Sequence, residues 1–153
     1  MTMAGGYDGR VAENVQHFEE LERIAGGLGI AEHVLFLKSP TDEEKISLLC
    51  SSSALVYTPS REHFGIVPIE AMHCRVPVVA VNDGGPTETV VDGETGFLRG
   101  ADPQEFADAM ESIAMAGDDA LARWGANGRK RVAANFSFEA FTSHLEAIIS
   151  HLN

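Results

Sequence analysis

Two glutamates, Glu62 and Glu70, are separated by seven residues and enclose the segment Phe64–Val67, which contains Gly65. A glycine adopts backbone torsions that a side chain would block, and it lets another molecule approach the main chain closely. If a helix begins at this segment, its first amides form a positively polarised seat for a phosphate group. Carboxylates only accept hydrogen bonds, so the two glutamates suit sugar hydroxyls better than phosphate. The combination indicates a nucleotide-sugar site.

Each carboxylate in this region also has a purely structural interpretation. The helix dipole stabilises acidic side chains in a first helical turn, and this applies to Glu70 and to Glu88. Pro68 favours a helix start after Gly65, because proline lacks the amide hydrogen that a first turn leaves unpaired. His63 suits a hydrogen-bond donor to a sugar and an exposed rim residue equally well. The functional interpretation therefore depends on the glutamates and the turn together.

The elements that must position these residues are apolar strands alternating with amphipathic helices. Strands are expected at 1–4, 33–37, 54–57, 76–81 and 97–98. Helices are expected at 11–28 and 41–50, after Gly65 as far as about 73, briefly around 87–88, and at 102–113, 119–132 and 137–152. This alternation predicts an α/β fold with a Rossmann-like parallel sheet, helices on both faces, and three helices at the end.

Ligands of such sheets bind beyond the carboxyl ends of the strands. Three expected loops lie there, at 37–40, 58–66 and 82–86. The last of them contains Gly84 and Gly85, which we expect to support the central loop. The predicted site therefore draws on several loops at one edge of the sheet.

Composition excludes some classes of function. A net charge of −12 over 153 residues argues against nucleic acid, which requires clustered Lys and Arg, and against a polybasic membrane contact. The length fits one domain. Cys50 and Cys74 are expected to be free thiols, and neither the cysteines nor the histidines have the spacing of a metal site. Residues 129–131 predict a small, basic, solvated helix face, and Trp124 is expected to serve packing.

Four motifs in order carry a family resemblance. They are Glu62-x7-Glu70, Pro77-Val78-Val79-Ala80, Gly84-Gly85-Pro86-x-Glu88 and Gly93-x-Thr95-Gly96-Phe97. Together they resemble the retaining GT-B glycosyltransferases of family 4. The segments 4–8, 57–60 and 62–68 are similar to those of the members that add α-1,3- and α-1,6-linked mannose in lipid-linked oligosaccharide assembly. Most of the family carries Gly where this chain has Arg75.

The resemblance implies a role for each site residue. Glu62 is placed in the catalytic centre, where it positions hydroxyls of the donor hexose; no protein base is implied, because the leaving phosphate is thought to take the proton. Glu70 holds the ribose hydroxyls. Donor sugar and diphosphate contacts fall on His63, Phe64, Gly65, Ile66 and Val67. The nucleobase lies against Leu37 and Lys38.

The resemblance also implies substrates and a larger protein. The donor is GDP-mannose, the acceptor is a dolichol-diphosphate-linked oligosaccharide, and no cofactor or metal is involved. Residues 1–153 correspond to a partial C-terminal donor-binding domain, inactive alone. The first strand of this domain and an N-terminal acceptor domain lie upstream. The full protein is expected on the cytosolic face of the endoplasmic reticulum membrane, which it meets only through regions outside this chain.

Two alternatives remain at this point. The chain belongs either to a family-4 enzyme that uses another nucleotide-hexose, or to a non-catalytic module that binds nucleotide or protein. The segments 4–8 and 57–60 favour the mannosyltransferase over the first alternative. Donor titrations distinguish all three.

Overall fold

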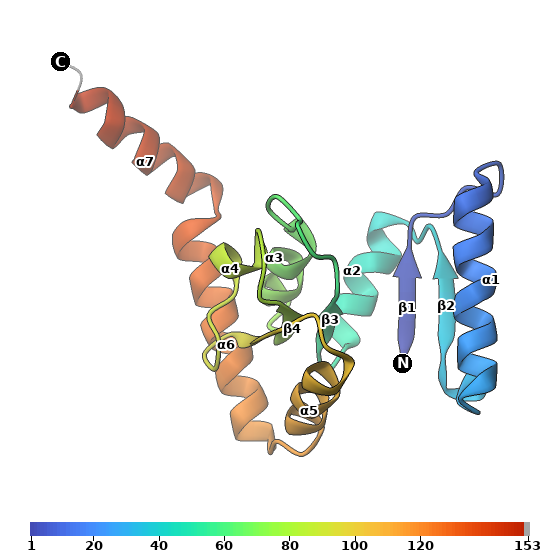
Figure 1. The fold of residues 1–153 in the computed structure, drawn as a ribbon. Helices are drawn as coiled ribbons and strands as arrows, with labels where there is room; N and C mark the ends of the chain where they lie inside the picture. Colours follow the sequence, from blue (N-terminus) through green and yellow to red (C-terminus); the bar gives the residue numbers. More distant parts are fainter. Residues whose placement is uncertain (152–153) are drawn as a thin grey trace. The chain divides into compact units, whose positions relative to one another are not determined.

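The computed structural model describes residues 1–151 (Figure 1). Its contacts divide the chain into two compact units, one formed by Met1–Lys45 and the other beginning at Ile46. The parallel strands fall into two sheets, a two-stranded sheet in the first unit and a three-stranded sheet in the second. Each unit therefore has a βαβ organisation of its own.

The first unit pairs β1 (Thr2–Gly5) with β2 (Leu35–Lys38) in parallel. The chain crosses between them through α1 (Ala12–Gly27) and a 3-10 turn, η1 (Ala31–His33). The ring of Phe18 on α1 stands edge-on to Tyr7 at 5.7 Å and to Phe36 at 5.4 Å, so aromatic packing joins the helix to β2 and to the segment that follows β1. The expected strand at 33–37 begins two residues later, because the 3-10 turn occupies residue 33.

Helix α2 (Asp42–Ser51) begins with the expected capping box. The Thr41 hydroxyl accepts from the Glu44 amide at 3.2 Å, and the Thr41 amide donates to the Glu44 carboxylate at 2.8 Å. Burial of Leu49 then joins the last turn of α2 to the core of the second unit.

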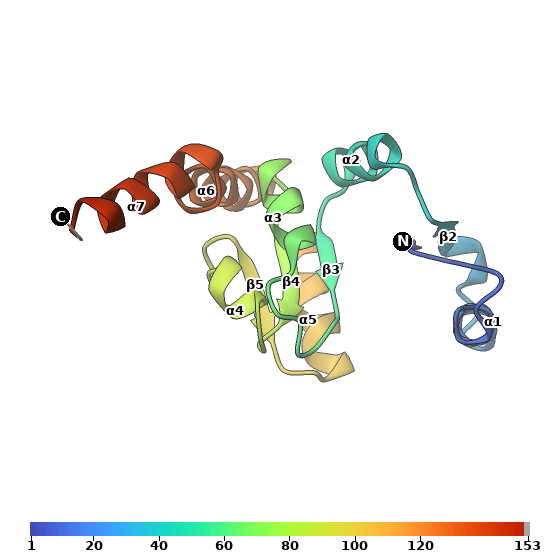
Figure 2. The same cartoon turned by 90° about the horizontal axis from the view of Figure 1, so that it is seen from above.

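In the second unit the strands are β3 (Leu55–Tyr57), β4 (Val78–Val81) and β5 (Gly96–Arg99), hydrogen-bonded in that order. The helices are α3 (Ile66–His73), α4 (Pro86–Thr89), α5 (Pro103–Ala114), α6 (Asp118–Asn135) and α7 (Phe138–Ser150). The three expected C-terminal helices are therefore present. Figure 2 shows α3 and α6 on one side of the sheet and α5 on the other.

Strand β4 is the centre of this unit, and all four of its residues are buried. Val78 and Ala80 pack into one hydrophobic cluster with Met72 of α3 and Val132 of α6. The alternate residues Val79 and Val81 pack into a second cluster with the side chains Phe106, Ala109 and Ile113 of α5. Successive strand residues face opposite sides, so a fully apolar strand requires cover on both faces. The predicted two-faced arrangement is confirmed.

Candidate functional site

The β3–α3 loop (Thr58–Gly65) leads directly into α3. Gly65 is the N-cap residue and has φ 70° and ψ 78°, in the left-handed region that favours glycine. It carries no side chain, and no side-chain cap hydrogen bond closes this end of the helix. The helix therefore begins with main-chain amides and no capping side chain, an arrangement suited to an anion.

Glu62 lies half-buried in this loop beside Tyr57, the last residue of β3. Burial raises the pKa of Tyr57, and the negative charge of Glu62 and a hydrogen bond to its carboxylate raise it further. The Tyr57 hydroxyl therefore stays protonated and donates a hydrogen bond to the carboxylate of Glu62. Tyr57 fixes the orientation of the carboxylate, a role that the sequence analysis did not assign.

The β4–α4 turn (Asn82–Gly85) presses against the same loop. The Gly85 amide donates to the carbonyl of Glu62 at 2.7 Å. A Cβ atom on Gly85 would lie 2.3 Å from the carbonyl carbon of Phe64, and one on Gly84 would lie 2.4 Å from the carbonyl oxygen of Glu62. Only glycines fit at this distance from a neighbouring main chain. The turn therefore fixes the backbone of the loop at Glu62 and Phe64, two of the residues predicted to bind the donor.

Asp83 adds a side-chain contact from the same turn. Its carboxylate accepts a hydrogen bond from the amide of Arg61 at 3.1 Å. Arg61 has φ 61°, an uncommon value for a residue with a side chain. Asp83 thus holds the residue before Glu62 in a left-handed conformation. Sequence reasoning missed Asp83, although it directly precedes the two glycines singled out there.

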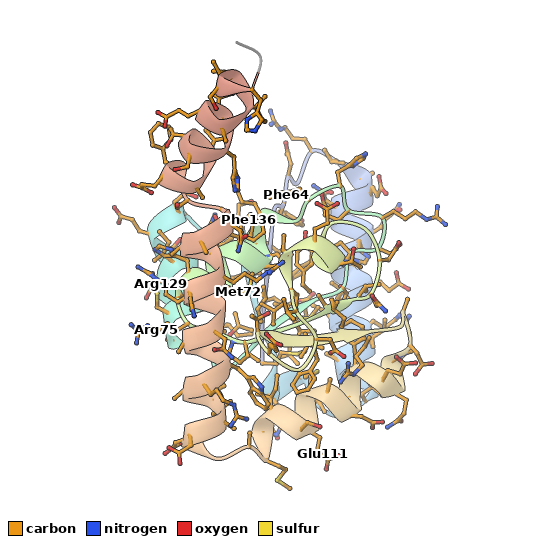
Figure 3. All side chains as sticks on the ribbon, turned by 90° about the vertical axis from the view of Figure 1, so that its left-hand side faces the viewer. Phe64, Met72, Arg75, Glu111, Arg129 and Phe136 are labelled. Carbon is orange, nitrogen blue, oxygen red and sulfur yellow. The ribbon has the colours of Figure 1, made fainter. Side chains whose placement is uncertain are left out.

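The remaining predicted residues of the loop and helix lie in different environments. Phe64 is 44% exposed, and its ring stands edge-on to that of Phe136 with the ring centres 5.9 Å apart. Figure 3 shows the two residues close to each other. Ile66 is 62% exposed. His63 is exposed as well, whereas Val67 is half-buried. The mouth of the loop therefore presents two apolar side chains and one imidazole to solvent.

Glu70 lies in the second turn of α3 and is half-buried, and its Oε2 atom is fully buried. Its negative charge helps to raise the pKa of Cys74, which lies one turn further along the chain. Glu62 and Glu70 therefore lie on either side of the first turn of α3, one in the loop and one in the helix.

Leu37 and Lys38 belong to β2 in the first unit. The Lys38 ammonium lies 3.4 Å from the ring centre of Phe18 and 4.2 Å from that of Tyr7, within the range of cation–π attraction. A cavity of about 250 Å³ opens at this end of the sheet, and its lining includes Gly5, Gly6, Asn14, Phe18, Leu37 and Lys38. The unit thus places a cation and aromatic faces around a pocket at the carboxyl ends of its strands.

Helix α6 fixes the far ends of the two short helices. The guanidinium of Arg129 donates to the carbonyl of His73 at the end of α3. Arg131 donates to the carbonyls of Thr89 and Glu88 in α4, both at 2.7 Å. The expected solvated basic face at 129–131 is confirmed for Arg129 and Lys130, which are exposed, and is wrong for Arg131, which is half-buried where it caps α4.

Close contact makes this capping possible. A Cβ on Gly125 would meet the carbonyl oxygen of Arg75 at 2.2 Å, and one on Gly128 would meet Met72 at 3.1 Å. Arg75, at φ 63°, has a left-handed backbone conformation, which a glycine adopts more readily than a residue with a side chain. Figure 3 shows Met72, Arg75 and Arg129 along the surface of α6. As expected, Trp124 serves packing, with its ring 5.2 Å from Phe97.

Metal-binding clusters and membrane-spanning helices are both absent from residues 1–151. No group of three or more His, Cys, Asp or Glu side chains there is arranged to hold a metal ion. No helix in that part of the chain is both long enough and apolar enough to span a membrane.

Comparison with known proteins places this geometry in a family. Residues 1–131 match the family described as glycosyl transferases group 1. Over 150 residues the chain is 47% identical to the α-1,3/1,6-mannosyltransferase ALG2 of Mus musculus. That alignment covers 98% of this chain and 36% of the mouse protein, so the chain spans about a third of the length of this relative.

Solved structures share the fold of this chain. Sucrose-phosphate synthase from Thermosynechococcus elongatus is 30% identical with a TM-score of 0.81, covering 99% of this chain and 38% of that one. Anabaena Alr3699/HepE in complex with UDP-glucose is 26% identical with a TM-score of 0.78, covering 98% and 41%. With a family match over most of its residues, the chain belongs to the glycosyl transferases group 1 family.

Proposed function

We propose that this chain is the donor-binding part of a retaining mannosyltransferase. The enzyme transfers mannose from GDP-mannose to a dolichol-diphosphate-linked oligosaccharide and forms α-1,3 and α-1,6 links. The observation that carries the proposal is the 47% identity to an α-1,3/1,6-mannosyltransferase across 98% of the chain. The amino end of α3 supplies a physical basis for donor binding.

The diphosphate of the donor lies at the start of α3 in this proposal. Main-chain amides of 64–67 donate to its oxygens, and the helix dipole favours its negative charge. Gly65 lets the phosphates approach the backbone, which a Cβ would obstruct. The chain carries a net charge of −12, so fixed amides are valuable here because they attract an anion without adding a side-chain cation.

The two carboxylates bind the two sugars of the donor. Glu62 accepts hydrogen bonds from hexose hydroxyls, with its orientation set by the proton of Tyr57. Glu70 accepts from the ribose hydroxyls, and His63 donates to the hexose or the phosphate. A misplaced carboxylate loses this positioning, so the contacts from the β4–α4 turn to the loop of Glu62 serve transfer as well as folding.

The reaction breaks the bond between the hexose and the diphosphate. Negative charge grows on the leaving diphosphate as the bond breaks, so donors aimed at that group provide the largest stabilisation. The leaving phosphate takes the proton of the acceptor hydroxyl, and Glu62 positions the sugar without acting as the base. No cofactor or metal is assigned to the chain.

The nucleobase lies against Leu37 and Lys38 of β2. The pocket that they help to line is bordered by aromatic rings and backbone, which suits a planar base. The acceptor is bound by parts of the full-length enzyme outside this donor site. The full enzyme works on the cytosolic face of the endoplasmic reticulum membrane and contacts the membrane through other regions.

Calorimetry on the full-length enzyme tests this proposal. GDP-mannose and GDP are expected to bind more tightly than UDP-glucose or ADP-glucose, and Glu70→Ala is expected to weaken GDP-mannose binding at least tenfold, about 1.4 kcal/mol. Glu111→Ala, on the exposed surface of α5, is the matched control and leaves the affinity unchanged. Tighter binding of UDP-glucose than of GDP-mannose would contradict the proposed donor.

One alternative has an observation in its favour. Anabaena Alr3699/HepE, solved in complex with UDP-glucose, shares this fold at 26% identity. Preference for UDP-glucose in the same titration supports an enzyme of that kind. Failure of every nucleotide to bind the full-length protein supports a non-catalytic module instead.

A further inference from the structure

The two cysteines of the chain lie next to each other although 24 positions separate them. Cys50 is in the last turn of α2, and Cys74 is the C-cap residue of α3. Their Sγ atoms are 2.7 Å apart, and both are free thiols. Cys50 is exposed and Cys74 is half-buried, so reagents in solution reach the pair from the side of Cys50. Both residues belong to the second unit.

We propose that Cys50 and Cys74 are a redox modification site that forms a reversible disulfide by exchange with a low-molecular-weight disulfide of the glutathione type. The distance between the sulfurs and the access from solvent carry the proposal. Formation of the bridge requires only a short approach of two neighbouring side chains, within the reach of disulfide geometry. The site is independent of the proposed function, because its readouts are covalent state and stability.

Exchange proceeds in two steps that balance. The Cys50 thiolate attacks one sulfur of the external disulfide, forms a mixed disulfide and displaces one external thiolate, which takes up a proton. Cys74 then loses its proton, attacks the Cys50 sulfur and displaces the second external thiolate. The two protein thiols are oxidised to one disulfide, and the external disulfide is reduced to two thiols.

The surroundings assign the order of attack. Burial raises the pKa of Cys74 to about 11, helped by the hydrogen bond and charge of Cys50 and by the charge of Glu70, and opposed by Arg129. Cys74 is thus a protonated thiol at neutral pH and a poor first nucleophile. Cys50 is the exposed partner and attacks first, so Cys74 is the resolving thiol.

The bridge would close a loop that contains the β3–α3 loop and all of α3. Cys74 also donates its amide to the carbonyl of Glu70 at 3.1 Å, so the anchored residue holds the end of the helix. Cross-linking removes conformational freedom from the unfolded chain. The melting temperature of the oxidised chain is therefore expected to exceed that of the reduced chain by about 5–10 °C.

The test equilibrates the chain in glutathione buffers of graded ratio, quenches with acid, alkylates the remaining thiols and maps the peptides by mass. In the wild type, we expect both thiols to become resistant to alkylation together. The two cysteine peptides are then joined, with a mass two hydrogens below the sum of the separate peptides. Cys74→Ser is expected to retain glutathione on Cys50, and Cys50→Ser to react little. Thermal melts of wild type and Cys50→Ser in the most oxidising and the most reducing buffer give the second readout. A redox-dependent shift of the melting temperature is expected in the wild type alone.

Three outcomes would overturn the proposal. The cysteines alkylate independently at every ratio, or the wild type accumulates glutathione on both residues without an internal bridge, or Cys50→Ser shows the same redox-dependent melting shift as the wild type. If Cys74→Ser folds poorly, Cys74→Ala keeps the test of the resolving step.

Discussion

Helices α3 and α5 begin at equivalent places, each following a parallel strand of the same sheet, yet their first turns are built differently. At α5 the Asp102 carboxylate accepts from the amides of Gln104 and Glu105 at 2.9 and 3.1 Å, and Pro103 is in the first turn. The Glu105 carboxylate in turn accepts from the Gly100 amide at 2.7 Å. The start of α5 is satisfied by the protein itself.

At α3 the capping position holds Gly65, and no side chain caps the helix. No capping hydrogen bond stabilises this end of α3. The loop before it is held instead by the β4–α4 turn, through the Gly85 amide and the Asp83 carboxylate. The difference teaches that one helix start serves folding while the other is kept open and externally supported. That is the arrangement expected where a ligand completes the hydrogen bonding.

The largest test of this contrast is Gly85→Ala. The new Cβ would overlap the main chain at Phe64, which cannot yield as a flexible side chain does. We expect a loss of about 3 kcal/mol in the free energy of unfolding, measured by urea denaturation. Gly117→Ala is the control, because its Cβ would meet nothing within 4 Å at φ −71°, and it is expected to change stability little. Equal effects of the two substitutions would show that the turn does not support the loop.

Gly65→Ala separates backbone torsion from crowding. Its Cβ would make ordinary contacts, 3.4 Å from a Tyr57 ring carbon, so the cost comes from the left-handed φ of 70°. We expect about 1–2 kcal/mol of destabilisation. We also expect GDP-mannose affinity in the full-length enzyme to fall about tenfold, because the Cβ lies where the diphosphate approaches. Unchanged affinity at reduced stability would mean that this helix start does not meet the donor.

Asp102→Ala is the opposite case. Removing an N-cap carboxylate typically costs about 1 kcal/mol, so urea denaturation should show a similar loss of stability to that of Gly65→Ala. Nucleotide affinity is expected to stay at the wild-type value, because the start of α5 is occupied by its own side chains. A fall in affinity of the size seen for Gly65→Ala would remove the distinction between the two helices.

The sequence predicted what local signals encode. The start of α5 is readable because Asp102, Pro103 and Glu105 act within one turn. The two-faced burial of β4 follows from its unbroken apolar run, and the start of α3 after Gly65 follows from glycine and proline preferences. In each case the physical cause lies within a few residues of its effect.

Contacts between distant segments were not readable. Asp83 supports Arg61 across 22 positions, and Arg131 caps α4 across more than 40. The proximity of Cys50 and Cys74 likewise depends on how α2 and α3 pack. No composition or period marks such pairs, because they result from tertiary packing. The assignments of Glu62 and Glu70 to particular sugars stay predictions, because only a bound donor tests them.

Tyr57 gives the smallest expected effect and the finest test of the α3 side. Its folded-state pKa is raised, chiefly by burial and then by Glu62, so the folded protein holds the phenolic proton more tightly than the unfolded chain does. This contribution to stability is complete below the unfolded pKa of about 10 and is lost as pH rises from there through the folded pKa. We therefore expect wild type to lose more stability than Tyr57→Phe between about pH 8 and about pH 11. Urea midpoints at both pH values measure the difference. Identical pH profiles for Tyr57→Phe and wild type would show that the hydroxyl does not hold Glu62.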